Sequence, residues 1–227
     1  MIELVIPTLW KSDKFHKMLP KYTENPYVSQ IHIIDNGLEF EKHYPNGFPP
    51  KWRVYSPPSY NKWMVNSAWN IGVSHCSPNS IIGVLNDDIE FDVDIFEWIV
   101  LNSDSMGILG MHSENYTTTE KNYEIVEIPQ HMHGWGCMFF FEKRNWSIIP
   151  SQLQLYFGDT WQFHMNEIPC KALKGLPMVD SNISETTARG EFFKEFNEKY
   201  IFERTWFMQN VQQGNYNLGY NGITQII

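Results

Sequence analysis

The chain has 227 residues, 42% of them hydrophobic and 19% charged, which is enough for one substantial core and short for two independent domains. A formal charge of −9 argues against a protein that binds nucleic acid mainly through phosphates. There is no signal-peptide pattern, no apolar run near the ~20 residues of a membrane span, and only three scattered cysteines. We therefore expect a single cytoplasmic domain over residues 1–227.

The amino-terminal half alternates segments typical of strands with segments typical of helices. Apolar runs predict strands at residues 2–7, 29–35, 52–55 and 81–85. Helices are predicted between them at 13–22 and 61–76. Their apolar sides are formed by Phe15, Met18, Leu19 and Tyr22 in the first and by Trp63, Val65, Ala68, Trp69 and Val73 in the second. This alternation is typical of a parallel sheet with right-handed crossovers.

Polar residues stand at the ends of three of these strands. They are Thr8 after the first strand, Asp35 with Asn36 after the second, and Asn86, Asp87 and Asp88 after the buried run 81–85. Ligands of parallel sheets bind beyond the carboxyl ends of the strands, so we expect these side chains to form one site. Two adjacent carboxylates repel each other and are costly to desolvate, which favours a divalent cation that bridges to a phosphate. Taken alone, Asp87 and Asp88 also fit a strand-ending turn or a helix cap.

The carboxyl-terminal half is less regular. Residues 91–104 predict a helix, and strands are predicted at 106–112 and 122–129. The segment 134–146 reads as a glycine-led strand that turns into a charged segment. Residues 191–206 form an amphipathic helical pattern, with burial expected for Phe192, Phe193, Phe196, Tyr200 and Phe207. The Gly- and Asn-rich end reads as a loosely docked tail.

The order of several short motifs resembles that of family 2-like glycosyltransferases with the GT-A fold, of the small kind that phage genomes often encode. The motifs are VIPTLW, IIDNG, NSAWNIGV, VLNDDIEFD, GWGCMFFF and YFGDTWQF. The resemblance implies an α/β fold with a Rossmann-like, mostly parallel central sheet flanked by helices. It also divides the chain into a nucleotide-sugar half at 1–100, a less regular acceptor half at 101–210 and a tail at 211–227.

The resemblance further implies a UDP-sugar donor, most simply UDP-glucose, and a Mn²⁺ or Mg²⁺ ion. Asn86-Asp87-Asp88 corresponds to the Asp-x-Asp motif of the family, with Asn86 replacing the first carboxylate. Asp88 would bind the metal and Asp87 would lie near the ribose. The other residues expected to line the nucleotide site are Pro7, Thr8, Asp35, which would bond the base or ribose, Asn36 and Asn70. Many relatives supply a later metal-binding His, which the stretch VDSNISETTAR lacks, so either Asp180 or Asn182 replaces it or the ligand is missing.

On the acceptor side, the resemblance assigns the catalytic base of an inverting transfer to Asp159. A separate carboxylate set apart from the metal ligands suits this role. Asp159 also fits the N-cap of a helix that begins near Thr160. The segment HGWGCMFF would lie under the acceptor, with Trp135 either stacking on it or buried in the core, and with Gly136 and His133 beside it.

Four alternatives stay open at this point. His131 and His133 could bind zinc with His112 or His164. The fold could serve a sugar-phosphate nucleotidyltransferase, although no glycine-rich loop follows the first strand, or a carbohydrate-binding protein that uses some of the 9 Trp residues. For the acceptor, the phage-like resemblance suggests a hydroxymethylated base in DNA, contacted by Lys143 and Arg144 among others, and a surface glycan or lipid-linked sugar is the alternative. The oligomeric state is not specified by any pattern.

Overall fold

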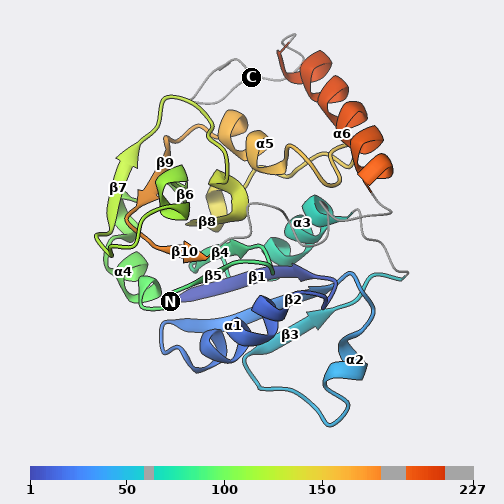
Figure 1. The fold of residues 1–227 in the computed structure, drawn as a ribbon, viewed down its shortest axis with the longest axis vertical. Coiled ribbons are helices and arrows are strands. Elements are labelled where there is room, and N and C mark those ends of the chain that lie inside the picture. The colour runs from blue at the N-terminus through green and yellow to red at the C-terminus, as the bar shows by residue number, and fades with distance from the viewer. Residues whose placement is uncertain (59–63, 180–192, 213–227) are drawn as a thin grey trace.

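The computed structural model describes residues 1–58, 64–179 and 193–212 (Figure 1). In the amino-terminal half the elements are β1 (Ile2–Thr8), α1 (Asp13–Glu24), β2 (Val28–Asp35), α2 (Phe40–His43), β3 (Trp52–Tyr55), α3 (Val65–His75), β4 (Ile81–Leu85), β5 (Glu90–Phe91) and α4 (Ile95–Leu101). In the carboxyl-terminal half they are β6 (Ile108–Met111), β7 (Glu124–Glu127), β8 (Met138–Glu142), α5 (Gly158–Met165), β9 (Cys170–Lys174), β10 (Met178–Val179) and α6 (Phe193–Phe207). Short 3₁₀ turns lie at Ser103–Ser105, Ser113–Tyr116, Trp135–Cys137 and Lys143–Asn145, and a π-helical turn at Met208–Gln212 follows α6.

The central sheet has the strand order β3-β2-β1-β4-β8-β6-β9-β7. Strands β3, β2, β1 and β4 are all parallel, β8 runs antiparallel to both β4 and β6, and β9 is parallel to β6. Strand β7 closes the far edge antiparallel to β9, and β10 pairs with β5 in a separate small sheet. The expected α/β fold with a mostly parallel central sheet flanked by helices is confirmed.

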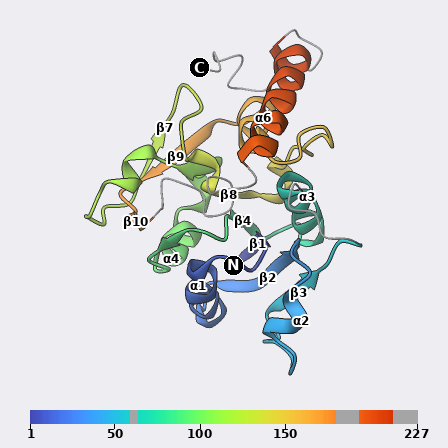
Figure 2. The ribbon, with the colours of Figure 1, turned by 45° about the vertical axis from the view of Figure 1, so that its right-hand side comes forward.

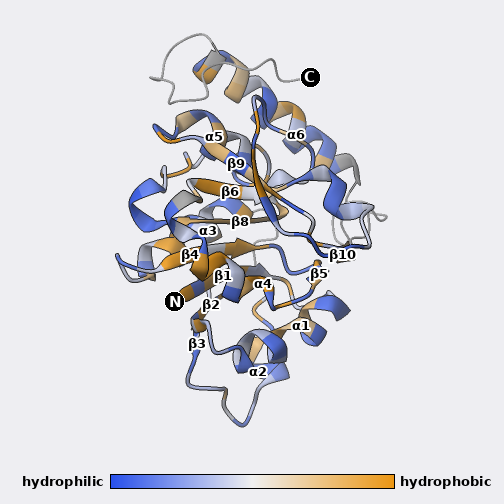
Figure 3. Cartoon of the chain, turned by 90° about the vertical axis from the view of Figure 1, so that its left-hand side faces the viewer, coloured by the Kyte–Doolittle hydropathy of each residue, from blue (hydrophilic) through white to orange (hydrophobic). Residues whose placement is uncertain are grey.

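Helices cover both faces of the sheet because the side chains of each strand alternate between them. From β1, Leu4 and Ile6 join the core that contains the apolar sides of α1 and α4. Val5 points the other way and joins the core formed with α3, α5 and the end of α6. Figure 2 shows α1 and α4 on one side of the sheet and α3 and α6 on the other. Strand β4 and most of β1, in the middle of the sheet, are hydrophobic (Figure 3), and the polar residues of β1 are Glu3 and Thr8.

Helices were predicted best where their buried residues recur at helical spacing along the sequence. All four apolar residues predicted for α1 are buried, as are Ala68, Trp69 and Val73 of α3. In α6, Phe196 and Phe207 are buried, but Tyr200 is 38% exposed. The predictions for Trp63, for Phe192 and for the side chain of Phe193 lie outside the described residues.

Two other elements begin later in the chain than predicted, because contacts with other segments determine where they start. The helix predicted at 91–104 starts only at Ile95, because Glu90 and Phe91 pair with β10. The strand predicted from Gly134 starts at Met138, because Gly134 adopts a left-handed conformation with φ 76° and a 3₁₀ turn follows it. Strands β9 and β10 were not predicted. In the part of the chain that the structure covers, no helix has the length and apolarity needed to cross a membrane.

Candidate active site

The ends of β1 and β4 bring Thr8 and Asp87 together at the carboxyl edge of the sheet. The two strands are parallel neighbours, and the Thr8 hydroxyl donates a hydrogen bond of 2.7 Å to Asp87 Oδ2. The Thr8 oxygen in turn accepts the backbone N–H of Trp10 at 2.8 Å. Thr8 therefore links the loop after β1 to the acidic pair after β4. Pro7 is buried in β1 opposite Ile34.

Burial and a neighbouring charge both act on the carboxyl group of Asp87. Burial raises the pKa of Asp87 to about 7, the charge of Asp88 adds to this, and the bonds from Thr8 and from the backbone N–H of Leu9 reduce the rise only in part. Lys14 donates to the backbone carbonyl of Asp88 at 3.1 Å. Two adjacent carboxylates that follow an apolar strand offer hard oxygen ligands, a donor set that fits Mn²⁺ or Mg²⁺.

The structure gives Asp35 a different role from the one expected. Its side chain is 2% exposed. One carboxylate oxygen accepts the indole N–H of Trp10 at 2.8 Å and the backbone N–H of Glu39, and the other accepts the backbone N–H of Phe40. Both oxygens therefore hold the loops after β1 and β2, and the expected bond to a nucleotide base or ribose stays a prediction.

Between these two loops, where the backbone N–H of Leu9 bonds to Asp87, lies a small pocket. It has a volume of about 270 Å³ and is lined by Leu9, Trp10, Lys11, Gly37, Glu39 and His43. The imidazole of His43 stacks on the Trp10 indole with ring centroids 5.2 Å apart. Trp10 and Leu38 have φ values of 61° and 55°, a left-handed conformation that is costly for residues with a Cβ and gathers at ligand sites.

Asn70 does not line this pocket. Its amide donates to the carbonyl of Ile149 at 2.8 Å, and its side-chain oxygen accepts N–H groups from Trp146 and Ile149. Asn70 therefore ties α3 to the segment after β8, and its expected contact with the nucleotide stays a prediction. Asn36 stays at the edge, buried, with its amide 3.4 Å from the carbonyl of Met64 at the start of α3.

The predicted base, Asp159, lies in the first turn of α5 and contacts His131. Nε2 of His131 is 3.0 Å from Asp159 Oδ2, and the side chains are 23% and 26% exposed. Burial by itself raises the pKa of Asp159, but the charge and hydrogen bond of His131 and the backbone N–H of Thr160 outweigh it and hold the pKa below its usual value. The carboxylate is ionised at neutral pH. The N-cap position belongs to Phe157, with φ 60°, so Asp159 is not the cap of α5.

Asp159 packs directly against Gly136. A Cβ placed on Gly136 would lie 2.2 Å from the Cβ of Asp159, so only glycine permits this approach. The same turn is connected to the acidic pair, because the backbone N–H of Asn86 donates to the carbonyl of Cys137 at 2.9 Å. Asp159 and the pair Asp87–Asp88 therefore belong to one edge of the sheet while remaining separate groups.

Trp135 and His133 differ in their exposure. Trp135 is 0% exposed and its indole N–H donates to the carbonyl of Lys171, which fits the second of its two expected places, the core. His133 is exposed. The contact of His131 with Asp159 was not predicted from the sequence, where His131 was considered as a zinc ligand or as a residue at the acceptor side.

The structure gives no support to the zinc alternative built on His131 and His133. Among the residues that the structure describes, these histidines do not gather with His112 or His164 into a group of three ligands. Asp180 and Asn182, considered as further metal ligands, lie outside the described residues.

No protein-family model matches the sequence, and no curated protein matches it. Several solved structures are similar. Staphylococcus aureus TarS 1–349 is 10% identical with a TM-score of 0.58, over 91% of this chain and 65% of that chain. HddC from Yersinia pseudotuberculosis, complexed with GMP-PN, is 13% identical with a TM-score of 0.54, over 91% and 100% of the two chains. GalNAc-T7 with UDP, GalNAc and Mn²⁺ is 11% identical with a TM-score of 0.52, over 94% and 51%.

This chain thus spans 65% of TarS 1–349 and 51% of the GalNAc-T7 chain. At such low identities the similarity establishes the fold alone. That fold is the one shared by GT-A glycosyltransferases and related nucleotidyltransferases.

Proposed function

We propose that the chain is a metal-dependent glycosyltransferase that moves a sugar from a UDP-sugar, most simply UDP-glucose, to an acceptor hydroxyl with inversion. The observation that carries the proposal is the placement of two separate acidic groups on one sheet edge, Asp87 with Asp88 and Asp159 with His131. Inversion needs one group to hold the donor and another to accept a proton on the acceptor side. The fold supports the proposal, as does GalNAc-T7, whose structure contains UDP, GalNAc and Mn²⁺.

On the donor side, Asp88 would hold the cation and Asp87 would lie beside it, kept in place by Thr8. When bound, the cation would neutralise the negative charge that develops on the diphosphate leaving group. The pocket next to the acidic pair would take the uracil, with Trp10 and His43 as its aromatic wall. Because Asp35 is already bonded within the protein, the base would be recognised mainly by this wall and by backbone groups.

On the acceptor side, Asp159 would take the proton of the acceptor hydroxyl. As that oxygen forms its bond to C1 of the sugar, the bond from C1 to the diphosphate oxygen breaks and the electron pair leaves with UDP. His131 holds Oδ2 of the carboxylate in one orientation, and the N–H of Thr160 holds Oδ1. The lowered pKa of Asp159 keeps it ionised, as a base must be.

A nucleotidyltransferase is the second candidate, favoured by Lys11 in the wall of the pocket and by Lys14, which reaches the backbone of Asp88. Such an enzyme would join a nucleoside triphosphate to a sugar phosphate and release pyrophosphate. Incubation with either substrate set distinguishes the two reactions, because only a glycosyltransferase consumes a UDP-sugar and releases UDP.

The proposed donor site is tested by calorimetric titration of UDP into the protein with and without Mn²⁺. We expect binding that requires Mn²⁺ in the wild type and is lost in Asp88→Ala. Asp104→Ala, which removes an exposed carboxylate in the turn Ser103–Ser105, is the matched control and should bind like the wild type. Failure of the wild type to bind UDP or any other nucleotide tested would reject the proposal.

The DNA acceptor is a separate part of the proposal. Two basic residues considered for phosphate contacts are already engaged, since Lys143 donates to the carbonyl of Ser74 at 2.8 Å and Arg144 pairs with Glu142. Fluorescence polarisation with DNA containing hydroxymethylated bases tests this acceptor. Salt-dependent binding would support it, whereas no binding at low salt would direct the search to glycans and lipid-linked sugars.

A further inference from the structure

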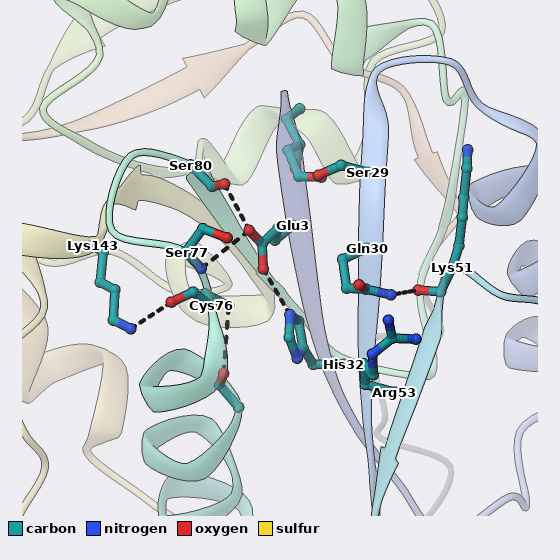
Figure 4. A network of polar contacts seen from close by, with 12 residues as sticks. Glu3, Ser29, Gln30, His32, Lys51, Arg53, Cys76, Ser77, Ser80 and Lys143 are labelled. Atoms are coloured by element: carbon teal, nitrogen blue, oxygen red, sulfur yellow. Dashed lines mark hydrogen bonds and ion pairs between the residues drawn. The ribbon is translucent and has the colours of Figure 1, made fainter.

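A second cluster of metal-binding side chains lies at the opposite end of β1 from Thr8 (Figure 4). Glu3 is near the start of β1, His32 lies in the middle of β2, and Cys76 is the C-cap residue of α3. Glu3 and Thr8 are five positions apart in a strand, which corresponds to about 16 Å. The cluster is therefore distinct from the candidate active site.

The three side chains converge on one point. Glu3 Oε2 lies 2.8 Å from His32 Nε2. One carboxylate oxygen of Glu3, one ring nitrogen of His32 and the sulfur of Cys76 all lie within 4.8 Å of one another. The residues are only 5%, 3% and 3% exposed. Two ligands of a tetrahedral zinc are separated by roughly 3.5 Å, because each lies about 2.0–2.3 Å from the metal. Small side-chain adjustments would bring all three atoms to that spacing.

The surrounding bonds already orient these atoms toward the common centre. The other oxygen of Glu3 accepts the backbone N–H of Ser77 at 3.1 Å and the hydroxyl of Ser80 at 2.7 Å. The other nitrogen of His32 lies 3.2 Å from the Tyr55 hydroxyl. Outer bonds of this kind fix the tautomer and direction of metal ligands in proteins. The sulfur of Cys76 lies 3.4 Å from the carbonyl of Gly72 and also interacts with the side chain of Glu3.

We propose that Glu3, His32 and Cys76 form a zinc-binding site, with a water or another small donor in the fourth position. A carboxylate, an imidazole and a thiolate together are a donor set that suits zinc, whereas Mg²⁺ and Mn²⁺ prefer oxygen ligands. Zn²⁺ with two anionic ligands and a neutral imidazole has no net charge, which favours a buried position. The metal would join β1, β2 and the connection from α3 to β4, so its role would be structural. Without metal, Glu3 and His32 form a buried ion pair.

The test uses the reduced full-length chain, treated with EDTA and then titrated with Co²⁺ as a spectroscopic substitute for zinc. We expect a thiolate-to-cobalt charge-transfer band that saturates at one equivalent and disappears when Zn²⁺ is added. Cys76→Ser and Cys76→Ala should lose the band. Cys170→Ser, which removes a different buried cysteine, should keep it. Asp88→Ala should also keep it, which separates this site from the donor site.

A wild-type protein that is folded by circular dichroism but gives no charge-transfer band would overturn the proposal. So would a band that persists in both Cys76 variants. Native mass spectrometry of the untreated wild type is a second measurement that needs no variant. One zinc retained per chain, and lost with EDTA, supports the site; its absence together with a silent cobalt titration leaves only the ion pair. None of these readouts depends on UDP binding or turnover.

Discussion

At the scale of single residues, the contact between His131 and Asp159 leads to a prediction about the proposed catalytic base. Asp159→Asn should lower turnover by about 10²- to 10⁴-fold, the usual contribution of a general base, while UDP binding stays unchanged. His131→Gln should cost less, because the carboxylate remains. Since His131 lowers the pKa of Asp159, its removal should shift the acidic limb of the kcat/KM profile to higher pH. The profile of exposed His133→Gln is the control; an unshifted limb in His131→Gln would contradict the assigned role.

Gly136 leads to a second prediction, which concerns the position of the Asp159 side chain rather than its charge. In Gly136→Ala the new methyl group would stand where the side chain of Asp159 now packs, 2.2 Å from its Cβ. We expect Asp159 to be displaced, so that turnover falls while metal-dependent UDP binding remains. Initial rates and UDP titration on the same preparation separate these effects. Normal turnover would mean that the α5 turn adjusts without loss of function.

Some residue roles could be predicted from the sequence and others could not. Thr8 and Asp87 were expected together because parallel neighbouring strands end at the same edge, a rule that needs only strand positions. The roles of Asp35 and Asn70 were missed because their hydrogen-bond partners, Trp10 and Ile149, are brought close by loops that have no periodic pattern. A motif shows that a side chain is polar and well placed. It does not show whether other groups of the protein already form hydrogen bonds with that side chain.

At the scale of elements, α6 supports the turn that carries Asp159. Phe207 stacks on Phe157 with centroids 5.4 Å apart, and Phe157 directly precedes Gly158 and Asp159. Glu203 is 0% exposed and accepts the backbone N–H groups of Leu155 and Tyr156. The helix is therefore fastened to the segment that leads into α5.

Removal of the Glu203 carboxylate should weaken this attachment. Glu203→Ala leaves two backbone N–H groups without their acceptor, so we expect a loss of about 1–3 kcal/mol in the free energy of unfolding. Arg204→Ala, at an exposed position of the same helix, should change stability by less than about 0.5 kcal/mol. Urea denaturation of the three proteins measures both values. Equal stabilities would show that the loop finds other acceptors.

The elements differ in how far they could be predicted. Helix α1 follows from four apolar residues at helical spacing, which the chain specifies locally. Strand β9, with the sequence CKALK, has charged residues at two of its positions and becomes a strand only because β6 and β7 lie on either side. Pairing with other strands, and not a local sequence pattern, therefore determines β9, and the same holds for β10.

At the scale of the whole molecule, buried charge links stability to pH. Burial raises the pKa of Glu3, but the hydrogen bonds from His32, Ser77 and Ser80 outweigh it and bring the pKa from 4.5 to about 2. A folded-state pKa below the unfolded value stabilises the fold above pH 4.5, and this contribution is lost as the pH falls toward 2. Its size is at most about 3 kcal/mol, from roughly 1.4 kcal/mol for each pKa unit.

This linkage is measured by denaturation of metal-free protein between neutral pH and pH 2. The difference in unfolding free energy between wild type and Glu3→Gln should be largest above pH 4.5 and should shrink as the solution becomes more acidic. Glu114→Gln, which changes an exposed carboxylate, is the control and should show a much smaller change. A difference that stays constant with pH would show that the Glu3 carboxyl is not held in its ionised form.

The antiparallel strand β8 also affects how this molecule is made. It covers the edge of β4, yet about 50 residues separate the two strands in the chain, so a ribosome that adds 5–20 residues per second delivers β8 several seconds after β4. During that interval β4 presents an apolar, unpaired edge, the kind of surface on which nascent chains associate. The amino-terminal half that carries Asp87 and Asp88 therefore relies on its partner half twice, for Asp159 and for protection from aggregation.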